Sequence, residues 1–334
     1  MFIKSLSKIN LNDEKFPIFF RLKWMNLQKD LDHKSDFWIY HDIENQSLIP
    51  IRISKIKFLK TGKYLYKPLN LAGNEFDSYS EKKILDKFHI FIENKIDIIL
   101  PPEHYINFKS IPSKVQYYPL GILFIDLSKD IDCIKNSMNS SFRSKIRQAE
   151  KNQVKIEFSL SKLSTFYKAY EFINSKQKLY IESIDFFKLH TEKLVDNIII
   201  GTSEINNELE SAIFCISDSY KCYFEYGGVM EKPHFSGSNK LLFLELIKEL
   251  KISGHQELVL GGYRENVNIN SKLHGIQTFK IRLGAVDKPG YHFLKIFKPN
   301  RYKLFVLLLQ LKSLIKKKEF LLVNLQGLDV SESN

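Results

Sequence analysis

The sequence predicts an α/β (α+β) protein made of two similar domains in tandem, each a mixed sheet flanked by helices. A chain of 334 residues can bury a sizeable core and more naturally forms two domains than one. Strand-like segments, a loop, an amphipathic helix and a further strand occur in this order at 37–100 and again at 197–260. The repeat is one of architecture and does not extend to residue-by-residue similarity.

The strand-like runs of the first half are Phe37–Tyr40, Leu48–Phe58, Tyr64–Leu71 and Ile96–Leu100. A helix is predicted from Ser78 to Asn94, with Ser78 and Glu81 forming a capping box at its start. Further on, the strand-like segment Gly121–Leu127 precedes a basic helix at Ser137–Asn152.

The second half contains predicted helices at Leu163–Tyr180, Ile184–Val195 and Lys240–Ile252, and predicted strands at Cys222–Tyr226 and Glu257–Leu260. Each of these strands ends in a glycine pair, Gly227-Gly228 and Gly261-Gly262. The helix at Lys240–Ile252 is predicted because its apolar residues recur at helical spacing, and Gly254 marks its end. A final strand is predicted at 279–284, where apolar and basic residues alternate.

The expected division is a first domain at 1–157 that ends with the basic helix, a second domain at 158–298, and a C-terminal amphipathic helix and tail at 299–334. The apolar stretch Tyr302–Lys312 is too short to span a bilayer, and Lys316–Lys318 follow it. Two interpretations stay open: a helix packed on the second domain with solvated lysines, or a helix lying on an anionic membrane.

Charge indicates an anionic partner without identifying it. The formal net charge is +12, which suits nucleic acid, a nucleotide-linked substrate, CoA or an anionic lipid surface. The abundance of Lys, Ile, Asn and Phe also suggests a compositional bias of the source genome. Such a bias raises the lysine count without a functional reason.

The cysteines indicate neither a metal site nor a disulfide framework. Cys133, Cys215 and Cys222 lack metal-ligand spacing, and the last two fall in apolar segments typical of small core residues. No metal site is therefore expected. The N-terminus shows no basic region followed by an apolar run and a cleavage site, so we expect a cytoplasmic protein.

The loop at 233–239 precedes the predicted helix at 240–252 and suggests an anion site. The first N–H groups of a helix lack intrahelical partners and lie at the positive end of the helix dipole, which suits phosphate or carboxylate. An ordinary turn capped by Ser or Asn is the alternative. The loop has neither a Walker lysine spacing nor G-x-G-x-x-G, which disfavours a nucleotide hydrolase or a Rossmann dehydrogenase.

Four motifs in order carry a family resemblance: Tyr226-Gly-Gly228, Ser236-Gly-Ser-Asn239, Leu260-Gly-Gly262 and Phe279-Lys-x-x-x-Gly284. Together they resemble the C-terminal half of the Fem-type transferases, the peptidoglycan bridge-forming enzymes of the GNAT acyltransferase superfamily. The segments Gly121–Leu127 and Ser141–Asn152 resemble that family's strand ending in Asp-Leu and its basic helix. The match departs at Gln153, where the family has glycine.

The resemblance covers about Gly121 to Gly284 and implies two GNAT-like domains. It implies transfer of an acyl or aminoacyl group to an amine or hydroxyl of a nucleotide- or lipid-linked cell-envelope precursor, of peptidoglycan or surface polysaccharide, by direct attack. Fem enzymes use aminoacyl-tRNA, and related GNAT-like proteins use acyl-CoA. Either is expected as a co-substrate, with no permanently bound cofactor. Such an enzyme could work peripherally at the inner face of the membrane.

Lys280 is the first catalytic candidate. On the predicted strand, Lys280 and Arg282 share a face, where Lys280 would neutralise the donor or stabilise the oxyanion formed during attack. The resemblance implies a functionally important lysine at this position. A surface strand with two solvated cations is the alternative.

Glu225 is the candidate general base, because the alternation places it on one face with Tyr223, and a carboxylate with a raised pKa could take the acceptor's proton. A paired structural carboxylate is equally compatible with the pattern. The candidate donor-binding residues are Ser236, Gly237, Ser238, Asn239 and Phe279. The candidate substrate-binding residues are Arg143, Arg147, Tyr226 and Arg282.

Arg143 and Arg147 lie one helical turn apart, so their guanidinium groups could bind a diphosphate or carboxylate, or form a solvated face. A different class of function is a non-catalytic protein that binds nucleic acid or a membrane surface, with Tyr117 and Tyr118 available for stacking. The ordered glycine motifs argue against it, because a binding surface alone does not require them.

Overall fold

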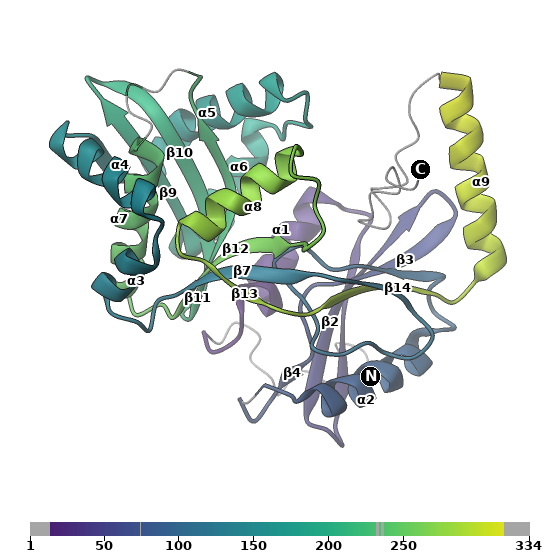
Figure 1. The fold of residues 1–334 in the computed structure, drawn as a ribbon. Coiled ribbons are helices and arrows are strands. Elements are labelled where there is room, and N and C mark those ends of the chain that lie inside the picture. The colour runs from purple at the N-terminus through teal and green to yellow at the C-terminus, as the bar shows by residue number, and fades with distance from the viewer. Residues whose placement is uncertain (1–13, 74, 232–233, 235–236, 317–334) are drawn as a thin grey trace. The chain divides into compact units, whose positions relative to one another are not determined.

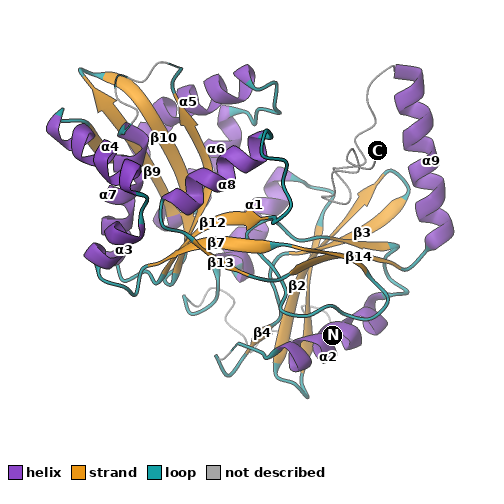
Figure 2. Cartoon of the chain, in the orientation of Figure 1, coloured by secondary structure: helices purple, strands orange, loops and turns teal. Residues whose placement is uncertain are grey.

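The computed structural model describes residues 14–316 except 74, 232–233 and 235–236. It is a mixed α/β structure with two sheets flanked by helices, which confirms the predicted fold class (Figure 2). Its contacts divide it into two compact units. Over the described residues, the first unit comprises Gln28–Gly121 and 289–316, and the second comprises 14–27 and Ile122–Lys288.

The sheet of the first unit has the order β1-β2-β3-β5-β14-β6, with β4 beside β2. These strands are β1 (Asp36–Asp42), β2 (Ser47–Ile56), β3 (Leu59–Tyr64), β4 (Leu69–Asn70), β5 (Ile98–Leu100), β6 (Gln116–Pro119) and β14 (Tyr291–Ile296). Helix α2 (Ser78–Ile92) packs with Ile99 and Phe293, and helix α9 (Pro299–Lys316) packs with Ile98 and Leu294. Neighbouring strand residues point to opposite faces, so α2 and α9 cover opposite faces of this sheet.

The sheet of the second unit has the order β13-β7-β12-β11-β10-β9-β8. Its strands are β7 (Gly121–Asp126), β8 (Lys155–Phe158), β9 (Ile198–Ile205), β10 (Glu208–Ser217), β11 (Lys221–Val229), β12 (Glu257–Tyr263) and β13 (Val286–Lys288). Its helices are α3 (Ile131–Ser137), α4 (Ser140–Lys151), α5 (Leu163–Lys176), α6 (Ile184–Lys193), α7 (Ser238–Ile252) and α8 (Lys272–Arg282). Helix α1 (Leu22–Leu31) runs from residues of the second unit into the first.

The two faces of the second sheet carry different helices (Figure 1). On β10, Ile213 and Cys215 belong to the core that includes α4 and α7. Phe214, between them, contacts Phe166 of α5 and Phe187 of α6. Cys215 and Cys222 are buried in the core of the second unit, as predicted for small core residues.

The predicted architectural repeat is confirmed by strand pairing. In the first unit, β1-β2 and β2-β3 are antiparallel, and β3 pairs in parallel with β5 after helix α2. In the second unit, β9-β10 and β10-β11 are antiparallel, and β11 pairs in parallel with β12 after helix α7. The same supersecondary unit therefore occurs twice.

The units do not coincide with the predicted ranges 1–157 and 158–298, because each sheet includes a strand from outside its own repeat. Strand β7 follows the first repeat along the chain and lies beside β12, whereas β14 follows the second repeat and lies beside β5. Helices α3 and α4 follow β7 and belong to the second unit with it. The C-terminal helix α9, which one interpretation placed on the second domain, packs on the first unit.

Some predicted local features are wrong. The segment 279–284 is not a strand but the end of α8, which begins after Ser271, whose side chain accepts from the N–H of His274. Gly284 follows the helix with a positive φ of 95°, as helix ends often require. The alternation of apolar and basic residues at 279–283 suits a strand. The four-residue spacing of Phe279 and Leu283 suits a helix equally well, and the structure has the helix.

Other corrections are smaller. The cap of α2 is Asp77, whose carboxylate accepts from the N–H of Ser80, and Glu81 instead accepts from the backbone and hydroxyl of Ser110. Strands β11 and β12 continue through their glycine pairs rather than ending at them.

Substitution of Gly237 tests the contact between α4 and the start of α7. A Cβ at this position would lie 2.1 Å from the carbonyl oxygen of Lys145, so the helices must separate to admit it. We expect Gly237→Ala to lower the free energy of unfolding by about 1–3 kcal/mol. Gly275→Ala in α8 is the control, because nothing lies within 4 Å of its Cβ position. It should stabilise by about 0.5–1 kcal/mol. Urea unfolding measures both, and equal stability of the two variants would contradict the close contact.

Candidate active site

The described members of the predicted site all lie in the second unit. They come from α4, β11, the start of α7 and the end of α8. Ser236 lies outside the described residues.

Strand β11 carries a β-bulge at Glu225. Tyr226 pairs with Phe214 of β10 and Phe224 pairs with the next residue, Cys215, so Glu225 is an extra residue on its strand. A bulge leaves its extra residue outside the regular ladder and changes which side chains share a face. The sequence contains no local signal for this bulge.

Because of the bulge, the alternation of faces predicted for the strand Cys222–Tyr226 does not continue past Glu225. Tyr226 contacts Phe187 of α6 at 5.2 Å between ring centroids, on the face of the sheet that carries α5 and α6. Phe224 packs against Phe243 of α7 at 5.2 Å, on the opposite face. In an unbulged strand Phe224 and Tyr226 would share a face. Tyr226, predicted to bind substrate, is thus part of an aromatic cluster with Tyr170 and Phe214 as well as Phe187.

At the start of α7, two predicted donor-binding residues make contacts inside the protein. Gly237 is the N-cap residue and contributes no side-chain hydrogen bond, and its α-carbon lies against the backbone of α4. The buried Ser238 hydroxyl donates to Oε2 of Glu210 at 3.1 Å. Asn239 is partly exposed. Because the N-cap residue of α7 is a glycine, it has no side chain to accept from the first N–H groups of the helix.

Glu210, a buried residue of β10 that sequence reasoning missed, organises the loop before α7. Its Oε1 accepts from the backbone N–H of His234 at 2.8 Å and lies 2.8 Å from His234 Nδ1. The hydrogen bond to Glu210 raises the pKa of His234. The carboxylate therefore holds the loop and the first residue of α7 together.

Lys280 lies in the last turn of α8 and is partly buried. Burial lowers the pKa of Lys280 from its ordinary 10.5 to about 8. Within the described part of the chain its ammonium group makes no hydrogen bond or ion pair. A desolvated amine of this kind is available to an anionic ligand.

A second desolvated amine belongs to Lys240 of α7. Its Nζ lies 4.9 Å from the ring centre of Phe142 and 6.0 Å from that of Phe279. Burial, with the charge of Lys145 as a smaller cause, lowers the pKa of Lys240 to about 8. On the sequence, Lys240 was one of several polar residues on a helix, and only the neighbouring rings distinguish it.

These rings form a phenylalanine cluster of Phe142, Phe224, Phe243 and Phe279, drawn from α4, β11, α7 and α8. Phe279 links it, with ring centroids 5.5 Å from Phe142 and 5.6 Å from Phe243. The predicted donor-binding Phe279 therefore lies inside an apolar cluster, and the predicted catalytic Lys280 is the next residue of the same helix.

The predicted basic residues divide between structural and exposed positions. Arg143 donates through Nη1 to the carbonyl oxygens of Asn136 at 2.9 Å and Met138 at 2.5 Å, at the end of α3. Arg147 and Arg282 are exposed. Arg147 and Arg143 therefore do not have equivalent roles, although their spacing predicted a shared one.

No family model and no curated protein matches the chain at the level of sequence. Among solved structures, FemX superposes with a TM-score of 0.69 and 13% identity, covering 89% of this chain and 97% of FemX. The chain has the fold of FemX. The resemblance to Fem-type proteins is thereby confirmed at the level of fold.

Two further structures share this fold more distantly. The C-terminal domain of a putative lysylphosphatidylglycerol synthetase from Agrobacterium fabrum has a TM-score of 0.51 and 11% identity, covering 78% of this chain and 84% of that one. The structure of L-PGS from Bacillus licheniformis has a TM-score of 0.50 and 12% identity, covering 80% of this chain and 90% of that one.

Within this FemX fold, the two repeats differ at the corresponding positions. Strands β2 and β3 of the first unit pair without a register shift, in contrast to β10 and β11. Helix α2 begins with a carboxylate, Asp77, that already accepts one of the helix N–H groups. An anion at that helix start would meet a like charge, whereas the start of α7 has a glycine cap and Lys240.

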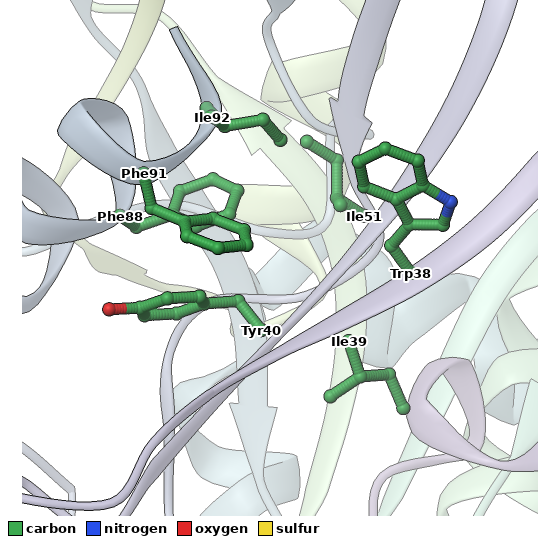
Figure 3. A pocket seen from close by; sticks show the side chains of 7 residues that line it. All are labelled: Trp38, Ile39, Tyr40, Ile51, Phe88, Phe91 and Ile92. Atoms are coloured by element: carbon green, nitrogen blue, oxygen red, sulfur yellow. The ribbon is translucent and has the colours of Figure 1, made fainter. Parts of the chain in front are cut away.

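The apolar pocket of the first unit does not offer a donor site. It is lined by Trp38, Ile39, Tyr40, Ile51, Phe88, Phe91 and Ile92 (Figure 3). Its cavity volume is about 10 Å³, close to the least that a single water needs, and its walls are apolar. It is a packing gap between α2 and the sheet.

Among the residues that the structure describes, no group of three or more His, Cys, Asp or Glu side chains is arranged to hold a metal ion. No described helix is long and apolar enough to cross a membrane.

Substitution of the two arginines separates their roles. Arg143→Met removes donors to the last carbonyl groups of α3, so we expect a loss of about 1–2 kcal/mol in the free energy of unfolding. Arg147→Met should change stability by less than about 0.5 kcal/mol. Urea unfolding of both variants measures the difference. Equal effects would show that the contacts of Arg143 with α3 contribute no stability.

Lys280→Met should stabilise the protein, because it removes an amine whose charged form is disfavoured by burial. At pH 7 we expect a gain on the order of 1–2 kcal/mol, since one pKa unit corresponds to about 1.4 kcal/mol. Between pH 8 and 10.5 the unfolded wild-type chain binds more protons than the folded one, so wild-type stability rises with pH and the advantage of the variant disappears.

The measurement is urea unfolding of wild type and variant at several pH values. Lys168→Met, at an exposed lysine of α5, is the control and should leave stability unchanged. A pH-independent difference between wild type and Lys280→Met would rule out a depressed pKa at Lys280.

Proposed function

We propose that this chain is a transferase that moves an activated acyl or aminoacyl group to an amine or hydroxyl of a cell-envelope precursor. The fold that it shares with FemX, with the C-terminal domain of a putative lysylphosphatidylglycerol synthetase and with L-PGS supports the general class. The proposed acceptor is a nucleotide- or lipid-linked intermediate of peptidoglycan or surface polysaccharide.

One observation carries the proposal: the second unit combines three features at residues of the phenylalanine cluster or next to them in the chain. The first is the bulge at Glu225, which follows Phe224, and the second is the glycine-capped start of α7. The third is a pair of desolvated amines: Lys240, near the rings of Phe142 and Phe279, and Lys280, which follows Phe279. A bulge provides backbone groups outside the ladder for a carbonyl, and a helix start with nearby cations suits phosphate. The first unit has a regular ladder and an acidic helix cap instead.

The proposed reaction is direct attack of the acceptor on the donor carbonyl. A bond forms between the acceptor nitrogen or oxygen and the carbonyl carbon, and the ester C–O or thioester C–S bond breaks. The acceptor's proton passes to Glu225 or to solvent, and the leaving group is protonated in turn. The Lys280 ammonium would stabilise the negative charge that develops on the carbonyl oxygen, a term that often dominates such catalysis.

The first candidate donor is aminoacyl-tRNA, which the resemblance to Fem enzymes implies. The second candidate is acyl-CoA, because the glycine-capped start of α7 suits a diphosphate. In the non-catalytic alternative, the chain would bind nucleic acid through exposed aromatic residues. Tyr118 is a poor platform, because its hydroxyl is bonded to His292 Nδ1 at 3.1 Å and its ring packs on that histidine.

The test is transfer of a radiolabelled group by the purified full chain. The donors are a pool of charged tRNAs and, separately, acetyl-CoA, and the acceptors are nucleotide-linked and lipid-linked peptidoglycan precursors. We expect transfer from one donor, at least tenfold slower in Lys280→Met, which corresponds to about 1.4 kcal/mol. Lys168→Met should retain wild-type turnover. Turnover should also fall as pH rises through about 8, because the charged form of Lys280 is required.

Undiminished turnover in Lys280→Met would remove the role assigned to that residue. Absence of transfer from both donors, with tight nucleic-acid binding that weakens steeply with salt, would favour the non-catalytic alternative.

A further inference from the structure

Helix α9 is apolar on two opposite sides. Its inner side, with Tyr302 and Phe305, packs on Leu59, Ile98 and Leu294 of the first unit. Its outer side carries Leu304, Leu307, Leu308 and Leu311, with 50%, 51%, 39% and 46% of their surfaces exposed. Positions three and four residues apart lie on one side of a helix, so these leucines form a continuous outer strip. A helix that is apolar all round is normally covered on all sides.

The part of the sequence that carries this leucine strip is basic. From 299 to 318 the chain contains no Asp or Glu and six basic residues: Arg301, Lys303, Lys312, Lys316, Lys317 and Lys318. Lys303 is exposed beside the strip, and Lys57, from the turn before β3, has its Nζ 5.7 Å from the ring centre of Phe305.

The inner contacts keep α9 on its own unit. Arg301 pairs with Asp97 at 2.7 Å and donates to the carbonyl oxygen of Phe58 at 2.5 Å. The outer strip can therefore be occupied without detaching the helix from the sheet.

We propose that the leucine strip of α9 binds an anionic lipid surface, with the helix lying in the plane of the interface. An apolar helix face bordered by Lys and Arg is the pattern that inserts at the boundary between headgroups and acyl chains, and anionic headgroups attract the flanking cations. The proposal does not depend on the transfer reaction.

Charge favours lipid over a second copy of the chain. A symmetric contact through α9 would place the same surface of two copies face to face, and the basic residues of each would meet those of the other. Anionic headgroups instead neutralise these charges, so the lipid surface is complementary both to the strip and to its flanks.

The test is sedimentation of the full chain with vesicles of phosphatidylcholine alone or mixed with phosphatidylglycerol. We expect at least tenfold stronger binding to the phosphatidylglycerol vesicles, weakened by salt. Leu304→Ser/Leu307→Ser should lose at least tenfold in binding, and Lys316→Gln/Lys317→Gln/Lys318→Gln should lose most of the preference for the anionic lipid. The control is Ile252→Ser/Ile269→Ser, at positions 81% and 74% exposed in the second unit, which should bind like wild type.

Three outcomes would overturn the proposal. The first is no binding of the wild type to phosphatidylglycerol vesicles. The second is a dimer, seen by analytical ultracentrifugation, that Leu304→Ser/Leu307→Ser dissociates while vesicle binding is absent. The third is vesicle binding that survives Leu304→Ser/Leu307→Ser and is abolished by Phe320→Ser/Leu322→Ser, which would assign it to the tail. Unchanged thermal unfolding of each variant shows that its fold is intact.

Discussion

The contact of helix α4 with the start of α7 positions most of the candidate site. At Gly237 the two backbones approach so closely that a Cβ would meet the carbonyl oxygen of Lys145. This approach brings Phe142 of α4 beneath the amine of Lys240. The same helix holds the end of α8, since the N–H of Asn139 donates to the carbonyl oxygen of Arg282 at 2.9 Å. One helix therefore contacts both of the helices that carry the desolvated lysines.

The two units show how one supersecondary arrangement can carry different local chemistry. Both have three antiparallel strands, a helix and a parallel strand in the same order. In the second unit a single extra residue, Glu225, changes which side chains face α7 and which face α5 and α6. In the first unit, the carboxylate of Asp77 already accepts a hydrogen bond from the backbone N–H of Ser80 in the first turn of α2. Fold similarity to FemX describes both units equally, and these local differences distinguish the second unit from the first.

The amines of Lys240 and Lys280 are costly in the free protein. Burial disfavours their charged forms, and stability alone would be better served by apolar side chains of similar size. Groups that destabilise the fold in this way are common at ligand-binding sites. The outer leucines of α9 are costly for a similar reason, because their apolar side chains are exposed to water. A partner that covered them would remove this cost.

Local patterns in the sequence determined much of this protein. Helical spacing predicted α7, and the repeated order of elements predicted two units of the same kind. The motifs from Tyr226 to Gly284 indicated the Fem-type fold. Where two local patterns compete, as at 279–284, the sequence alone did not decide, because a four-residue apolar spacing fits a helix and alternation fits a strand.

Only the tertiary structure decided the exchange of β7 and β14 between the sheets, the bulge at Glu225, and the difference between Arg143 and Arg147. It also distinguished Lys240 from the other lysines of its helix. The physical reason is common to all of these. Strand register, hydrogen-bond partners and desolvation are set by neighbours distant along the chain, and a window of consecutive residues contains none of them.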